Sequence, residues 1–179
     1  VFQFEAASMQ KILKDAQPNN IEDLVALNAL YRPGPMQYID RYVACKNGLQ
    51  EIEYADPELE PILKNTYGVI VYQEQVMQVA QIIAGYTLGQ ADILRRIMGK
   101  KKVEKLAEEK VKFVAGAEKL GRDPKHAADI FEMLEPFAQY GFNKSHAVAY
   151  SIVAYQTAFL KANYPSEFLA ANLTNEMNN

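Results

Sequence analysis

The most informative segment of the chain runs from residue 140 to residue 150 and reads Tyr-Gly-Phe-Asn-Lys-Ser-His-Ala-Val-Ala-Tyr. Apolar residues follow it at helical spacing, so a helix is predicted to begin near Asn143 to Ser145. The first turn of a helix favours acidic residues because its N-terminus carries about half a positive charge, yet Lys144 and His146 stand there. Free N–H groups, a lysine and a histidine together suit phosphate. The segment therefore predicts an anion-binding helix entrance.

Aromatic rings accompany these cations. Four side chains recur at every second position: Tyr140, Phe142, Lys144 and His146. An extended backbone would place all four on one side. A ring beside cations suits a nucleotide, with the base or sugar against the ring and the phosphates against the charges. A packed aromatic corner, with His146 bonded to a backbone carbonyl, is the alternative that the residues leave open.

A second basic segment, residues 94–102, reads Leu-Arg-Arg-Ile-Met-Gly-Lys-Lys-Lys. Arg95 and Arg96 fall in the last turns of a predicted helix, and Lys100 and Lys101 follow it. Cations near a helix C-terminus complement its dipole, so a solvated helix end is one interpretation and phosphate binding is the other. Adjacent helical residues point about 100° apart, and the two arginines therefore need not serve one ligand.

The charge of the chain is concentrated. Residues 95–112 hold eight basic and three acidic residues on a chain whose net charge is −3, which predicts one defined anionic partner rather than a general nucleic-acid coat. No apolar run reaches the roughly 18 residues that cross a bilayer, so no membrane association is expected. One cysteine, Cys45, excludes an internal disulfide and fits the cytoplasm, and no metal-ligand cluster is visible.

Most of the chain is predicted to be helical, from apolar periodicity, cap residues and prolines. The one β-like run, residues 69–72, has no visible pairing partner. We expect an all-α, compact multi-helix domain over residues 1–179, with sub-lobes 1–68 and 73–179. The first residues carry no initiator Met, which suggests a piece of a much longer chain.

Three further residues are weaker candidates for the site: Arg32, Gln73 and Gln75. Arg32 belongs to a rigid Arg-Pro-Gly-Pro turn, and the glutamines, at a predicted helix start, can donate hydrogen bonds to a base. A plain corner and ordinary helix capping are the alternatives. The sequence contains no Asp-x-Asp pair, no Gly-rich phosphate loop and no nucleophile beside a base, so the chain is not expected to be catalytic alone.

Five blocks of the sequence occur in the same order in the bacterial C-family replicative DNA polymerases, which the chain resembles over nearly its whole length. The blocks are residues 31–36 (Tyr-Arg-Pro-Gly-Pro-Met), 67–77, 85–89, 94–102 and 140–147. The resemblance implies the fingers domain of the catalytic subunit, a largely helical domain that holds the incoming deoxynucleoside triphosphate and the templating strand against the palm.

The resemblance also implies residue roles. Expected to bind the triphosphate are Arg95, Arg96, Lys100, Lys101, Lys144 and His146; expected near the base or sugar are Tyr140, Phe142 and Asn143. The palm aspartates are not in this chain, so Mg²⁺ is expected to be bound outside it. The expected partners are deoxynucleoside triphosphates, primer–template DNA, the other domains of the catalytic subunit and replicative holoenzyme subunits. A free-standing helical nucleic-acid-binding or protein-docking module is the alternative.

Overall fold

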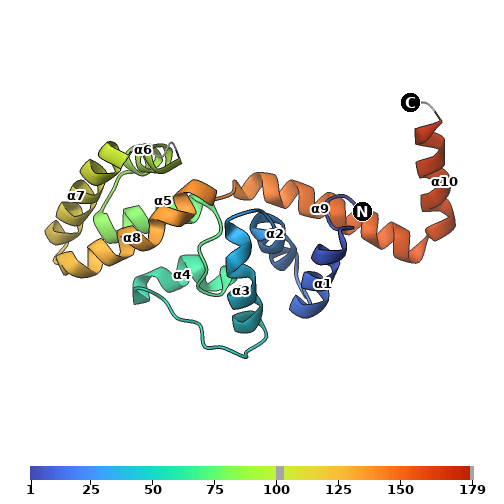
Figure 1. The fold of residues 1–179 in the computed structure, drawn as a ribbon, viewed down its shortest axis with the longest axis horizontal. Helices are drawn as coiled ribbons and strands as arrows, with labels where there is room; N and C mark the ends of the chain where they lie inside the picture. The colour runs from blue at the N-terminus through green and yellow to red at the C-terminus, as the bar shows by residue number, and fades with distance from the viewer. Residues whose placement is uncertain (100–102, 178–179) are drawn as a thin grey trace.

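The computed structural model describes residues 1–99 and 103–177, without the side chains of residues 99, 103, 104 and 138–140. Within these residues the chain forms ten α-helices (Figure 1). They are α1 (Ala7–Ala16), α2 (Ile21–Leu30), α3 (Ile39–Lys46), α4 (Glu60–Leu63), α5 (Gln73–Ala84), α6 (Leu88–Gly99), α7 (Val103–Lys119), α8 (Pro124–Tyr140), α9 (Lys144–Asn163) and α10 (Pro165–Glu176). Short 3-10 turns cover Pro35–Tyr38, Pro57–Leu59 and Lys64–Thr66. The all-α prediction is confirmed.

Local sequence signals explain where most helices begin. The side chain of Asn20 accepts a hydrogen bond from the Asp23 N–H at 3.0 Å at the start of α2. Asp123 caps α8 in the same way, through the His126 N–H at 2.9 Å, and a proline follows it at the first helical position. Among residues 1–99 and 103–177, no helix is long and apolar enough to cross a membrane.

The backbone between α8 and α9 differs from the sequence-based expectation. Helix α8 continues past Pro136 to Tyr140, and α9 begins at Lys144, so only residues 141–143 are extended. The predicted alternation of residues 140–146 on one side of an extended strand is therefore wrong. Packing explains the longer helix, because the partly buried ring of Phe137 packs against both hydrophobic cores and its centre lies 4.5 Å from that of the Tyr38 ring.

Two hydrophobic cores hold the helices together. One is built by α4 to α8, and the other by α1, α2 and α3 together with α9. Figure 1 shows α5 to α8 on one side of the molecule and α1 to α3 beneath α9 on the other. Sub-lobes of residues 1–68 and 73–179 were expected. The two cores are not divided at this point of the sequence, because α9, from the second range, packs on α2, from the first.

The run of residues 69–72 lies where the two cores meet. Successive side chains of an extended segment point to opposite sides. Accordingly Ile70 is buried in the core of α4 to α8, while Val69 and Val71 are buried in the other core. The run also has a partner that the sequence did not reveal. The Phe142 N–H donates to the Val71 carbonyl at 3.2 Å, and the Gln73 N–H donates to the Phe142 carbonyl at 3.0 Å.

Helix α10 stands apart from both cores. It packs against α9, and none of its described residues is buried. In Figure 1 it lies at the opposite end of the molecule from α6 and α7. The candidate site residues lie elsewhere, on or beside α2, α5, α6 and α9.

The closest approach between α5 and α7 yields a stability prediction. A Cβ atom on Gly116 of α7 would lie 2.3 Å from the Ala84 carbonyl oxygen, so Gly116→Ala forces the two helices apart. We expect the free energy of unfolding to fall by about 1–3 kcal/mol, measured by urea denaturation. Gly89→Ala in α6 is the matched control, since a Cβ there meets nothing within 4 Å and alanine is the better helix former. Equal effects of the two substitutions would contradict this account.

Candidate functional site

The two basic segments meet at the first turn of α5. The side-chain oxygen of Gln73 accepts a hydrogen bond from Arg95 Nη1 of α6 at 3.0 Å. The carboxylate of the next residue, Glu74, accepts from the Lys144 N–H through both oxygens at 3.2 Å and from Asn143 Nδ2 at 3.1 Å. Two consecutive side chains of one helix turn therefore hold α6 on one side and the start of α9 on the other.

The N-terminus of α9 is bound by a carboxylate of the chain itself, that of Glu74. The side chain of Asn143 caps the helix by accepting from the His146 N–H at 2.9 Å, as the sequence predicts. The first turn of α9 contains no acid, and Glu74 supplies the negative charge that favours this end of a helix. Nothing local in the sequence connects Glu74 to a backbone N–H 70 positions away.

The Lys144 side chain is held by two groups. Its ammonium forms an ion pair with Glu22 of α2 at 2.9 Å and lies 5.3 Å from the centre of the Tyr72 ring. A cation over an aromatic face is attracted by the ring quadrupole. Both Lys144 and Glu22 keep more than a third of their side-chain surface exposed, so the ion pair is open to water.

Arg95 and Arg96 converge on one carboxylate, although they are adjacent in a helix. Asp92 lies three and four residues before them, and its Oδ1 accepts from Arg95 Nε at 3.0 Å and from Nη2 at 2.7 Å. Its Oδ2 lies 2.8 Å from Arg96 Nη2. The hydrogen bond from Arg95 holds the pKa of Asp92 below its usual range, so this carboxylate is ionised at neutral pH. Lys100 and Lys101 lie outside the described residues.

A column of rings and one guanidinium runs along the start of α9. The Arg32 guanidinium carbon lies 4.3 Å from the centre of the Phe142 ring, and Phe142 meets His146 edge-on at 5.2 Å. His146 in turn lies 4.2 Å from Tyr150, which stacks on Phe2 at 5.1 Å. Burial lowers the pKa of Arg32 from its ordinary value. The side chain of Tyr140 lies outside the described part of the chain, so its predicted role stays a prediction.

Gln75 has a structural role. Its side-chain oxygen accepts from the backbone N–H groups of Val71 at 2.8 Å and Tyr72 at 3.0 Å. Its amide nitrogen donates to the Ile62 carbonyl at 3.0 Å and to the Thr66 hydroxyl at 2.8 Å. The side chain is buried and both N–H groups of the amide are used, so it has no donor left for a base.

Three acidic residues near the cations were missed as site residues by sequence reasoning: Asp92, Glu22 and Glu74. Asp92 had a readable signal, because acids and bases three and four positions apart in a helix face each other. Glu22 and Glu74 had none, because they belong to other helices. Among the described residues, no three or more His, Cys, Asp and Glu side chains are gathered as metal ligands would be.

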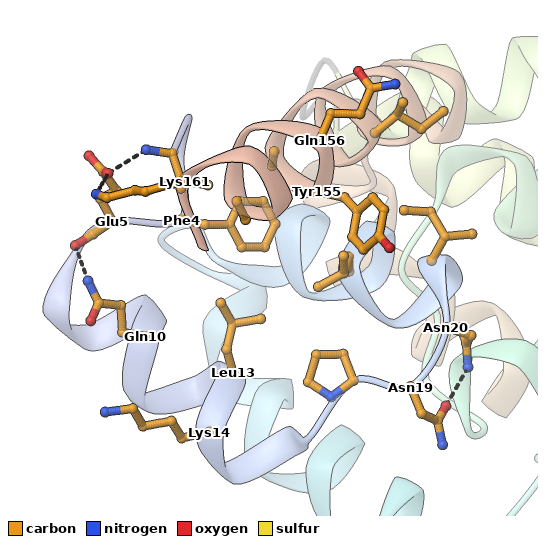
Figure 2. Close-up of a pocket in the computed structure, with 17 residues that line it drawn as sticks. Phe4, Glu5, Gln10, Leu13, Lys14, Asn19, Asn20, Tyr155, Gln156 and Lys161 are labelled. Atoms are coloured by element: carbon orange, nitrogen blue, oxygen red, sulfur yellow. Dashed lines mark hydrogen bonds and ion pairs between the residues drawn. The ribbon is translucent and has the colours of Figure 1, made fainter. Parts of the chain in front are cut away.

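An apolar groove of about 1290 Å³ lies away from this site, between α1, the start of α2 and α9 (Figure 2). Leu13 and Tyr155 line it, and the ion pair of Glu5 with Lys161 closes one end at 2.8 Å. None of the residues predicted from the sequence to bind a ligand lines this groove.

Comparison with known proteins identifies relatives along the whole chain. The family model of the bacterial DNA polymerase III alpha subunit finger domain matches residues 1–121. The chain is 64% identical over 179 residues to the DNA polymerase III subunit alpha of Borreliella burgdorferi, and 67% identical over 178 residues to that of Treponema pallidum. These alignments cover 100% and 99% of this chain but only 16% and 15% of the two relatives. The chain therefore spans about a sixth of their length.

Two buried tyrosines beneath the site are expected to respond differently to loss of the hydroxyl. Among the described residues, the buried hydroxyl of Tyr72 has no hydrogen-bond partner, whereas that of Tyr42 donates to Asp23 at 3.1 Å. Tyr72→Phe should leave the free energy of unfolding unchanged or raise it by up to about 1 kcal/mol, and Tyr42→Phe should lower it by about 1.5–3 kcal/mol. Urea denaturation of the two variants measures the difference. A Tyr72→Phe variant as unstable as Tyr42→Phe would mean that the Tyr72 hydroxyl is satisfied.

The same two hydroxyls predict how stability depends on alkaline pH. Burial raises the pKa of Tyr42 and of Tyr72. Above about pH 10 the unfolded chain loses these protons while the folded chain keeps them, so the folded state is stabilised below that pH and loses this stabilisation as the pH rises. Denaturation series from pH 9 to 11 should show stability falling. The slope should be smaller in Tyr42→Phe, and an unchanged slope would contradict the assignment.

Proposed function

The chain belongs to the bacterial DNA polymerase III alpha subunit finger domain family, and from this premise we propose that it binds and positions the incoming deoxynucleoside triphosphate beside the templating strand. The observation that supports this most directly is the meeting of Arg95 and the Lys144 backbone at the first turn of α5. Cations from segments far apart in sequence are thereby held on α6 and α9, which these hydrogen bonds join to α5. Groups held by rigid helices are suited to positioning a ligand without reorganisation.

In this proposal the cations bind the triphosphate. Its phosphates are contacted by Arg95, Arg96, Lys144 and His146, with Lys100 and Lys101 joining them. Negative charge grows on the departing pyrophosphate during nucleotidyl transfer, and nearby guanidinium and ammonium groups stabilise it there. Gln73 positions Arg95, because the Arg95 guanidinium donates to it.

The start of α9 would face the sugar and base. The ring of Phe142 has Arg32 over its face and His146 in an edge contact. Asn143 follows Phe142 directly, and Tyr140 precedes it by two positions. A rigid ring is a suitable surface for a base or a sugar of any of the four nucleotides, because every base has a π-face.

We propose further that the longer protein containing this chain is a replicative DNA-directed DNA polymerase acting in the cytoplasm. Its partners would be primer–template DNA, the other domains of the alpha subunit and the replicative holoenzyme. In this proposal Mg²⁺ is held by the palm of the longer protein, and this chain alone is inactive.

Substitution of the cations in the full-length polymerase tests this function. Arg95→Ala and Lys144→Ala should each raise KM for deoxynucleoside triphosphates by roughly tenfold, because each removes a charge-assisted contact to phosphate. Primer–template affinity should change much less. Steady-state kinetics with each of the four nucleotides and a DNA-binding titration measure the two effects.

Lys161→Ala is the matched control, since this lysine lies near the other end of α9 and also pairs with a carboxylate. It should leave nucleotide kinetics unchanged. Normal nucleotide kinetics in both Arg95→Ala and Lys144→Ala, or a loss confined to DNA binding, would overturn the proposed function.

A further inference from the structure

The carboxylate of Asp92 occupies the space between the two guanidinium groups of α6. Arg95 grips one carboxylate oxygen with two N–H groups, and Arg96 lies 2.8 Å from the other. A phosphate group bound by two arginines needs the same arrangement, with separate oxygens facing separate guanidinium groups. In this structure the chain's own anion therefore holds the position that a phosphate would take between Arg95 and Arg96.

Charge compensation extends to Lys144 of α9. Lys144 is paired with Glu22, and the Lys144 N–H is bonded to Glu74. The cationic side chains of Arg95, Arg96 and Lys144 thus meet two carboxylates, those of Asp92 and Glu22. With Glu74, which accepts from the Lys144 backbone, these six side chains carry no net charge. A triphosphate carries several negative charges, so it gains little from this site unless carboxylates move away from the cations.

Asp92 is the carboxylate best placed for such an exchange. It contacts two of the three cations, and its side chain is about 29% exposed, so water and dissolved anions reach the pair. Arg96 is 66% exposed. Ion pairs of this exposure are weak, because water screens the charges and side-chain entropy opposes the contact. A multiply charged phosphate can therefore replace the singly charged carboxylate, while a singly charged anion gains no advantage over it.

We propose that Asp92 is an internal counter-ion which the triphosphate replaces at Arg95 and Arg96, and which returns to them when pyrophosphate leaves. The inference rests on the proposed function of the site. Asp92 then has two effects on the reaction. It weakens nucleotide binding by competing for the arginines, and it speeds pyrophosphate release for the same reason. A residue that only oriented Arg95 would have the opposite effect, because its loss would weaken binding.

The test is Asp92→Asn in the full-length polymerase, which removes the charge and keeps the size of the side chain. KM for deoxynucleoside triphosphates and the inhibition constant of added pyrophosphate should both fall by about two- to fivefold. The rate constant kcat should stay unchanged or fall, because pyrophosphate leaves more slowly. Asp92→Glu retains the charge and should keep both constants closer to those of the unsubstituted protein.

Glu58→Gln is the charge-matched control. Glu58 is an exposed carboxylate paired with a different guanidinium, that of Arg122, at 2.8 Å. Its neutralisation should change neither KM nor the pyrophosphate inhibition constant. If the Asn variant does not fold, Asp92→Ser removes the same charge from the same exposed position and has the same expected result.

The possible failures are distinguishable. If Arg95→Ala raises KM but Asp92→Asn leaves KM unchanged or raises it, Asp92 is not a competing anion; this inference is then overturned and the proposed function stands. A general electrostatic effect would appear as an equal fall of KM in Glu58→Gln, which also overturns it. If Arg95→Ala leaves KM unchanged, the arginines do not bind the nucleotide, and the proposed function fails together with the inference.

Discussion

The backbone pairing between residues 71–73 and Phe142 is the contact on which the rest of this structure depends. Its two hydrogen bonds bring the start of α5 against the start of α9, although about 70 residues separate them. In this register Glu74 reaches the Lys144 N–H while Gln73 reaches Arg95. The pairing is sheltered, since Val71 and Tyr72 are buried. Competition from water is therefore low, and a buried backbone group left unpaired would be costly.

Electrostatics around this contact follow from the composition of the chain. A cluster of cations on a protein with a net charge of −3 attracts the protein's own carboxylates, and Glu22 and Asp92 pair with these cations in the structure. Such pairing lowers the affinity of the cations for every external anion, because the anion must compete with a carboxylate of the chain. It also favours ligands whose charge exceeds that of a carboxylate, which is a form of selectivity that a bare basic patch would lack.

Much of the fold could be predicted from the sequence because its determinants are local. Asn20 and Asp123 cap helices where the sequence places them, and Asn143 caps α9. The continuation of α8 as far as Tyr140 was not predicted, and Phe137 near this end of the helix packs against both cores. No local rule contains that information.

Local features of the site could also be predicted from the sequence, whereas its long-range contacts could not. The sequence indicated the two basic segments, but it could not indicate the bond between Glu74 and α9, which crosses 70 positions of chain. Asp92 differs from Glu74 in this respect, because its spacing to Arg95 and Arg96 within one helix was visible from the start. Gln75 is not part of the proposed site, because its side-chain amide already makes hydrogen bonds with the surrounding loop.

The alternation of Ile70 with Val69 and Val71 has a mechanical consequence. A strip of backbone one strand wide, with side chains anchored in both halves of the protein, acts as a pivot. Sliding one half past the other would pull these anchors from their pockets and stretch the bonds to Phe142. Tilting one half about the length of the strip would leave both the anchoring side chains and the hydrogen bonds to Phe142 in place. A tilt about this strip would therefore be the motion that moves the arginines of α6 relative to the start of α9.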